Sequence, residues 1–160
     1  MDVRIRTEIE DLLHAYADCI DDDRLEEWPG FFTERCIYKV IPLENAALNM
    51  PIPLMYADSR AMLKDRVTAH RKANIFAPHV YRHLVSHPRI TGEENGEFIT
   101  RSNYAIFRTM LDAAEYGRSE LFSVGVYHDR IVFDEDGAKF KERVVVVDTA
   151  RIPTLLVTPL

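Results

Sequence analysis

The chain has 160 residues and a formal net charge of −6, with 47% hydrophobic and 29% charged residues. This composition is typical of one globular domain, here residues 1–160, and excludes a disordered chain. Basic side chains are scattered, so we expect no nucleic-acid partner. No apolar run approaches the roughly 20 residues that cross a bilayer, and the first residues lack a secretory signal pattern. With only Cys19 and Cys36, a reduced, cytoplasmic chain without a membrane partner is expected.

Helical periodicity dominates the first part of the chain. Residues 4–20 place apolar side chains at the spacing of an amphipathic helix, and a short second helix is expected over 24–32, bent or started by Pro29. Residues 36–41 alternate like a strand. The proline-rich stretch 42–57 is predicted to be a long loop, of the kind that is usually functional or an interaction arm. Asp58 or Ser59 is predicted to cap a third helix that runs to about residue 75.

After Pro78 the apolar period changes from 3.6 to 2, which predicts four long strands. These strands cover residues 80–90, 97–110, 120–133 and 139–148, and a tail follows over about 149–160. Two hairpin turns are expected, at Asn95-Gly96 and at Asp136-Gly137. Helices followed by antiparallel hairpins predict an α+β domain in which a curved sheet wraps helices on one side.

Three histidines recur at every fourth residue, namely His79, His83 and His87. On a helix this spacing would let them share a zinc ion. The segment has the composition of a strand, however, and four strand residues span roughly 13 Å, which one ion cannot bridge. We therefore expect histidines that are packed or hydrogen-bonded along a sheet face. The sequence also has no nucleophile elbow, no glycine-rich phosphate loop and no paired Cys and His ligands.

One catalytic interpretation stays open from the residues alone. A cone-shaped α+β fold can hold an apolar pocket between sheet and helices, where burial raises the pKa of a carboxyl group and makes it a usable base. The candidate side chains for such a pocket are Tyr16, Asp18, Tyr38, His83 and Tyr104. The alternative is that the tyrosines are core residues with satisfied hydroxyls and that Asp18 lies on the exposed edge of the first helix.

Several arginines lie inside segments otherwise suited to a packed sheet: Arg82, Arg101, Arg108 and Arg143. Arginine is enriched at protein interfaces, so these residues favour a subunit docked in a larger assembly. The alternative is pairing across the sheet with Glu97, Glu120 or Glu142.

Five stretches in the same order along the chain resemble the small (beta) subunits of aromatic-ring-hydroxylating dioxygenases. They are EEWPGFFT at 26–33, CIYKV at 36–40, DRV at 65–67, YRHLVS at 81–86 and KERVVVVD at 141–148. The stretch at 41–45 and the ending at 152–160 look most like the branch that acts on carboxylated arenes such as salicylate, anthranilate or terephthalate.

The resemblance implies a cystatin-like (NTF2-like) cone, in which N-terminal helices pack on a strongly curved, mixed, mostly antiparallel sheet. It implies a structural beta subunit with no catalytic, cofactor-binding or metal-binding residue of its own. The partner would be a large alpha subunit that carries a Rieske 2Fe-2S cluster and mononuclear Fe(II), in an alpha3beta3 hexamer, and the isolated chain would self-associate as a trimer.

On this interpretation, the partner hydroxylates an aromatic carboxylic acid. We predict that five residues act as subunit contacts or packing anchors: Trp28, Arg82, His83, Arg101 and Arg143. The competing hypothesis is a free-standing pocket enzyme of the same fold, an isomerase, dehydratase or cyclase that uses an Asp or His base.

Overall fold

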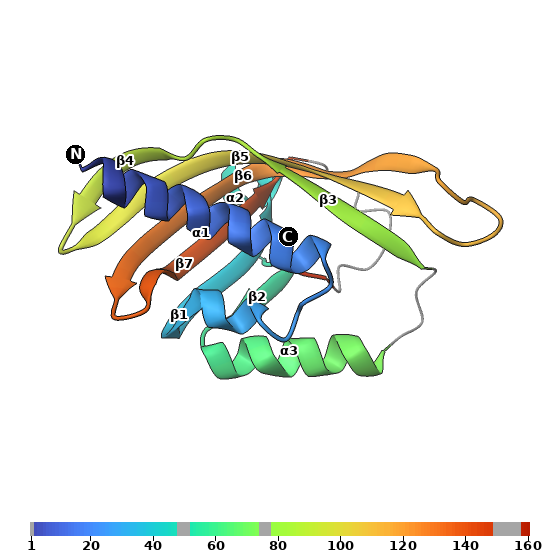
Figure 1. The fold of residues 1–160 in the computed structure, drawn as a ribbon, viewed down its shortest axis with the longest axis horizontal. Helices are drawn as coiled ribbons and strands as arrows, with labels where there is room; N and C mark the ends of the chain where they lie inside the picture. Colours follow the sequence, from blue (N-terminus) through green and yellow to red (C-terminus); the bar gives the residue numbers. More distant parts are fainter. Residues whose placement is uncertain (1, 48–51, 74–77, 149–157) are drawn as a thin grey trace.

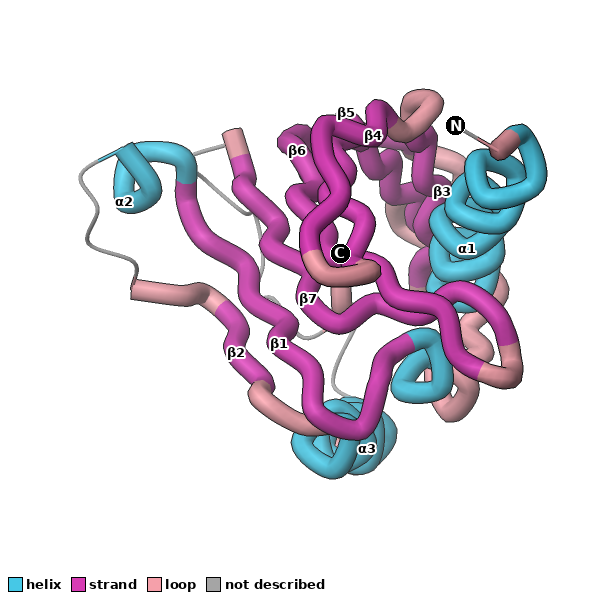
Figure 2. Tube along the Cα trace, turned by 90° about the vertical axis from the view of Figure 1, so that its left-hand side faces the viewer, coloured by secondary structure: helices cyan, strands magenta, loops and turns pink. Residues whose placement is uncertain are grey.

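The computed structural model describes residues 2–47, 52–73, 78–148 and 158–160. Within these ranges a seven-stranded sheet curves around the hydrophobic core, and helices α1 and α3 cover that core from one side (Figures 1 and 2). Helix α1 packs against strands β3 and β7, whereas α3 packs against β1 and the short helix η1. The predicted α+β architecture, with helices on one side of a curved sheet, is confirmed.

Both long helices begin at capped positions. Helix α1 spans Val3–Asp21, and the side chain of Asp2 caps it by accepting a hydrogen bond from the Arg4 N–H at 2.9 Å. Helix α3 spans Arg60–Lys72 and is capped by the hydroxyl of Ser59, not by Asp58. The prediction for residues 4–20 is confirmed. The predicted end of the third helix near residue 75 lies outside the described residues.

The region between the two helices is more structured than the sequence predicted. Only a 3-10 turn, η1 (Trp28–Phe31), replaces the helix expected over 24–32, because Pro29 sits in its first turn and no side chain caps it. Strand β1 (Phe32–Pro42) begins four residues earlier than predicted. The expected loop over 42–57 is wrong in part, since it contains helix α2 (Leu43–Ala47) and strand β2 (Met55–Ala57), which pairs with β1.

The strands run in the order β2-β1-β7-β6-β5-β3, and β4 pairs with β5. Strand β1 is parallel to β7 (Gly137–Val147), and every other pairing is antiparallel, so the sheet is mixed as predicted. Strands β5 (Glu97–Met110) and β6 (Ser119–Asp134) match their predictions closely.

The single strand predicted over residues 80–90 is wrong. The structure has two shorter strands there, β3 (His79–Val85) and β4 (Arg89–Glu94). Pro88 lies in the break and has no N–H for a strand ladder. Ser86, at the start of the break, stays attached to β5, because its N–H donates to the Asn103 carbonyl and its hydroxyl accepts from the Asn103 N–H, both at 2.9 Å.

One predicted turn is confirmed and the other is shifted. Asn95 and Gly96 have φ values of 53° and 78°, as a two-residue hairpin turn requires. In the β6–β7 hairpin the loop residues are Glu135 and Asp136, one position earlier than predicted. Gly137 follows them with φ 108°, in the region that favours glycine.

Within the described ranges, no helix is long and apolar enough to cross a membrane. Cys19 and Cys36 are both buried free thiols. Burial raises the pKa of each thiol to about 11, so both stay protonated near neutral pH.

Gly125 on β6 provides a test of how tightly the sheet is packed. A Cβ at this position would collide with the Val146 carbonyl oxygen and would lie 2.9 Å from the Tyr104 hydroxyl. We expect Gly125→Ala to lower the free energy of unfolding by about 1–3 kcal/mol, because a backbone atom cannot move aside. Urea denaturation measures the change. The matched control is Gly30→Ala, whose Cβ would have no atom within 4 Å; an equal loss in both variants would contradict the prediction.

Candidate functional site

The interior of the sheet contains a fully buried ion pair between neighbouring strands. Asp129 on β6 lies directly opposite Arg143 on β7, and both side chains are 0% exposed. The Arg143 Nε and Nη2 donate to the two Asp129 carboxylate oxygens at 2.8 and 2.7 Å. This is the two-pronged geometry that arginine and a carboxylate favour, and it fixes both side chains in orientation.

Aromatic rings surround the Arg143 guanidinium. Its central carbon lies 4.3, 4.0 and 4.1 Å from the ring centroids of Tyr16, Tyr127 and Phe140. Burial acts to lower the pKa of Arg143, but the adjacent Asp129 carboxylate outweighs burial and raises it. Arg143 is therefore a permanent internal cation that joins α1, β6 and β7.

A second buried acid–base pair joins helix α1 to strand β3. The Asp21 carboxylate accepts from the backbone N–H of His83 at 2.7 Å and from its Nδ1–H at 2.5 Å. The His83 side chain is 1% exposed and that of Asp21 is 3% exposed. Among the residues that the structure describes, none bonds the His83 Nε2, and this nitrogen is shielded from solvent. The pair resembles an oriented catalytic base in geometry, but water and substrate cannot reach the nitrogen that would act.

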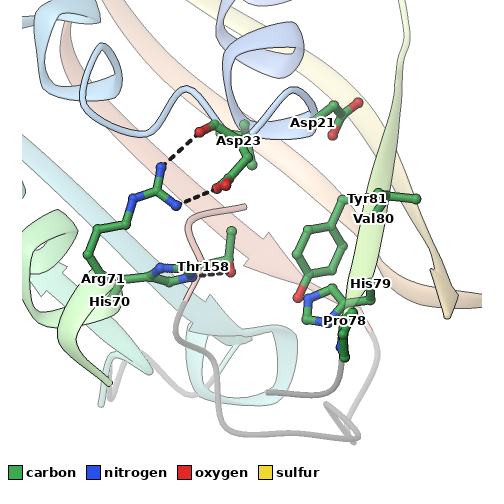
Figure 3. Close-up of a pocket in the computed structure, with 10 residues that line it drawn as sticks. Asp21, Asp23, His70, Arg71, Pro78, His79, Val80, Tyr81 and Thr158 are labelled. Atoms are coloured by element: carbon green, nitrogen blue, oxygen red, sulfur yellow. Dashed lines mark hydrogen bonds and ion pairs between the residues drawn. The ribbon is translucent and has the colours of Figure 1, made fainter. Parts of the chain in front are cut away.

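A hollow of about 400 Å³, which we call the mouth pocket, lies where α1 and α3 end and β3 begins. Figure 3 shows Tyr81 and His79 on one side of it, His70 and Arg71 on the other, and Thr158 between them. The Arg71 guanidinium binds Asp23 and Glu26, and His70 Nε2 lies 3.1 Å from the Thr158 hydroxyl.

Burial lowers the pKa of His70, and the neighbouring Arg71 lowers it further, so the imidazole is neutral near pH 7. Arg71 and Asp23, the charged side chains on that wall, are paired with each other. The mouth pocket is therefore polar on that wall, where one guanidinium is shared by the carboxylates of Asp23 and Glu26.

The structure does not gather the side chains proposed for a pocket enzyme. Asp18 is exposed on α1, as its alternative interpretation predicted. Tyr104 bonds Ser123 at 3.0 Å and stacks on Tyr127. Tyr16 and Tyr38 do meet, but around the main chain of Leu160. His83 is separate from all of these, beside Asp21.

The three regularly spaced histidines are also separate. His83 points inward to Asp21, His87 lies 3.0 Å from Glu10, and His79 packs edge-on against Tyr81. In the part of the chain that the structure describes, no group of three or more His, Cys, Asp or Glu residues is placed to hold a metal ion.

The five residues predicted as contacts or anchors fall into two sets. Trp28, His83 and Arg143 are buried in the interior. Arg82 on β3 and Arg101 on β5 are exposed on the outer face of the sheet. Whether either set contacts another subunit stays a prediction. Arg108, which sequence reasoning grouped with them, points inward and pairs with Glu120, one of the glutamates considered for it.

The outer face around Arg82 is unusually apolar. Phe107 on β5 lies opposite both Arg82 and Leu121, and Leu84 lies two residues further along β3. We call these four residues and Val80 the outer patch. Its four apolar members are between 38% and 57% exposed. An exposed apolar set of this kind is typical of a protein contact surface.

Comparison with known proteins places this architecture in a family. The model of the SnoaL-like domain matches residues 1–144. The chain is 40% identical to the anthranilate 1,2-dioxygenase small subunit of Burkholderia cepacia, over 99% of this chain and 96% of the relative. It is 34% identical to the terephthalate 1,2-dioxygenase terminal oxygenase component subunit beta 1 of a Comamonas species, over 91% and 92%.

A solved structure agrees with these matches. It is a beta subunit assigned to an aromatic-ring-hydroxylating dioxygenase of Novosphingobium aromaticivorans, with a TM-score of 0.86, 40% identity and coverage of 97% and 96% of the two chains. The chain belongs to the beta subunits of aromatic-ring-hydroxylating dioxygenases. The fold expected from the resemblance is confirmed, and the comparisons support the beta-subunit interpretation over a free-standing pocket enzyme.

Asp129 is the main site residue whose role sequence reasoning missed. In the beta subunit it is the buried partner of Arg143. An internal arginine needs a buried carboxylate to neutralise it, but which carboxylate faces Arg143 depends on the register of the β6–β7 hairpin.

We expect Arg143→Met to lower the free energy of unfolding of the beta subunit by about 3–5 kcal/mol, because Asp129 is then buried without a partner. The double variant Arg143→Met with Asp129→Leu should recover most of this loss. Denaturant titration of the parent, the two single variants Arg143→Met and Asp129→Leu, and the double variant measures the coupling. Independent, additive losses would mean that the two residues do not act as a pair.

The Asp21–His83 contact predicts a second local effect. In Asp21→Ala the backbone N–H and the Nδ1–H of His83 lose their acceptor. We expect each donor left unpaired to lower the free energy of unfolding by about 1–3 kcal/mol. Asp18→Ala changes an exposed residue of the same helix, and its free energy of unfolding should stay within about 0.5 kcal/mol of that of the parent. Thermal unfolding of both variants provides the measurement, and equal stability would contradict a structural role for the pair.

Proposed function

We propose that the chain is the structural beta subunit of a multicomponent Rieske non-haem iron oxygenase that hydroxylates an aromatic carboxylic acid. The observation that carries the proposal is 40% identity over nearly the whole chain to the small subunit of an anthranilate dioxygenase. The other relative acts on terephthalate, which is also an aromatic acid. The chemistry of this group of relatives supports a carboxylated arene as the substrate of the complex.

We assign the redox centres to the partner, a large alpha subunit with a Rieske 2Fe-2S cluster and mononuclear Fe(II). The donor sets of the described residues support this division, because His83 is committed to Asp21 and no three ligating side chains converge. Such centres need two histidines and two cysteines, or two histidines and a carboxylate around an open position. The role of this chain is then to assemble and stabilise the alpha subunit in an alpha3beta3 complex, in the cytoplasm, where its buried thiols stay reduced.

The outer patch is the surface we propose for subunit contacts. It combines apolar side chains with Arg82, and an arginine among apolar residues is the composition of interface cores. Arg101, further along β5, is also exposed on this face. Without the alpha subunit, the uncovered patch should drive self-association of the chain, with a trimer as the expected product.

Co-expression with the large oxygenase subunit of the same organism tests the proposal. We expect a coloured complex of two chain sizes, with iron and sulfide in proportion to the large chain and none in the isolated 18.5 kDa chain. Iron bound stoichiometrically by the isolated chain would contradict the proposal, as would turnover of a small molecule by that chain alone.

Variants locate the contact surface in the same assay. Leu84→Asp together with Phe107→Asp places charges in the outer patch and should reduce recovery of the complex at least about tenfold, because buried unpaired charge opposes association. Val3→Asp is the matched control, since it also adds a carboxylate at an exposed apolar position, at the start of α1. Equal recovery with both variants would place the contact elsewhere.

A further inference from the structure

A row of basic side chains crosses the outer face of the sheet at one level. Arg89 on β4 lies opposite Arg101 on β5, and Arg101 lies opposite His128 on β6. His128 lies opposite Val144 on β7, and Val144 lies opposite Lys39 on β1. Residues directly opposite one another on neighbouring strands point to the same face, and the strands are about 4.8 Å apart. The four basic residues, which we call the basic row, therefore extend over about 19 Å.

The chain itself does not neutralise the basic row. Within the described ranges, none of the four basic side chains forms an ion pair or a hydrogen bond. Arg89, Arg101 and His128 are exposed, and Lys39 is half-buried. Arg89 and Arg101 are like charges directly opposite one another, an arrangement that lowers the stability of a sheet. The row therefore needs a reason other than the stability of the single chain.

The charges next to the basic row, towards the β4–β5 turn, are balanced. Arg130 forms ion pairs with Glu94 and Glu97, and Lys141 also pairs with Glu97. Glu142 lies opposite Arg130 at this level. Carboxylates of the same chain thus compensate the neighbouring cations, whereas no acidic residue lies in the basic row. The row is suited to carboxylates that come from outside the chain.

Helix α1 carries a surface of the opposite charge. Asp11 and Asp18 are exposed on one face of the helix, and Asp22 at its C-cap continues the same line. In the part of the chain that the structure describes, the carboxylates of Asp11 and Asp18 form no ion pair or hydrogen bond. The Asp22 carboxylate lies 3.6 Å from Arg24. We call the three aspartates the acidic stripe. It is about 16 Å long at the rise of a helix, close to the length of the basic row.

The basic row and the acidic stripe lie on opposite sides of one molecule. Helix α1 covers the inner face of the sheet and its exposed residues face away from the strands, whereas the basic row is on the outer face (Figure 1). Two complementary surfaces that cannot meet within one chain produce a head-to-tail contact between copies, which closes into a ring when the rotation allows it. We propose that the basic row of one copy binds the acidic stripe on α1 of a second copy. The inference goes beyond the proposed function, since it concerns the isolated chain and requires no large subunit.

Sedimentation equilibrium of the isolated chain tests the contact. We expect the parent to self-associate, with a dissociation constant that rises at least about tenfold between about 0.05 and 1 M NaCl, because salt screens exposed charges. Arg101→Glu and Asp18→Lys each reverse one charge in one of the two surfaces, and each variant should associate at least about tenfold more weakly than the parent. A chain that carries both changes should recover the association, because the introduced carboxylate then faces the introduced ammonium group.

The matched controls are Lys64→Glu and Asp65→Lys on α3. They make the same two changes of net charge at exposed positions outside both surfaces, and they should associate as the parent does. Circular dichroism checks that each variant is folded. If a reversed charge prevents folding, Arg101→Gln or Asp18→Asn removes the same charge without reversing it and should weaken association in the same direction.

Three results would overturn the proposal. The first is a parent chain that stays monomeric at low salt and millimolar concentration. The second is self-association that neither salt nor Arg101→Glu weakens, which would assign the contact to the outer patch. The third is a double variant that associates as weakly as the single variants. If Arg101→Glu leaves self-association unchanged but lowers recovery of the complex with the large subunit, the basic row binds that subunit and not a second copy.

Discussion

The Asp129–Arg143 pair is the constraint on which the rest of the interior depends. Two opposite charges at 0% exposure are tolerable only when each satisfies the other with good geometry. The contact between the two side chains fixes the register of β6 against β7. The Arg143 guanidinium in turn positions the rings of Tyr16 and Phe140, which pack against it. Because Tyr16 belongs to α1, one ion pair sets the position of the first helix relative to the sheet.

The inward and outward faces of the sheet differ in what they can do. Inside, buried polar groups pair across the fold, as Asp21 does with His83, and the pocket beside Pro159 holds only about 10 Å³. Outside, β3, β5 and β6 present apolar side chains and arginines to solvent. The exposed apolar side chains and arginines give the outer face the composition of a contact surface. This arrangement fits a subunit that acts by binding another chain.

Local patterns predicted the parts of the fold that local physics determines. The spacing of Ile9, Leu13 and Tyr16 gave α1, and Asn95-Gly96 gave a hairpin, since each depends on neighbours in the sequence. The sequence could not reveal that Met55–Ala57 is a strand, because three residues have no period and gain their bonds only from β1. The break at Ser86–Pro88 was hidden for a related reason, because it depends on how β3 and β4 each pair with β5.

The Asp129–Arg143 pair also depends on strand pairing that local sequence patterns cannot reveal. Arg143 was predicted to matter, but its partner depends on register. Counting outward from the β6–β7 turn, with Asp134 opposite Gly137, would pair Asp129 with Glu142, and two acids would face each other. An irregularity between Arg130 and Ile131 shifts the register by one residue and brings Arg143 opposite Asp129 instead. The cost of burying each charge alone selects this irregular register over the regular one, which is a property of the assembled sheet and of no single segment.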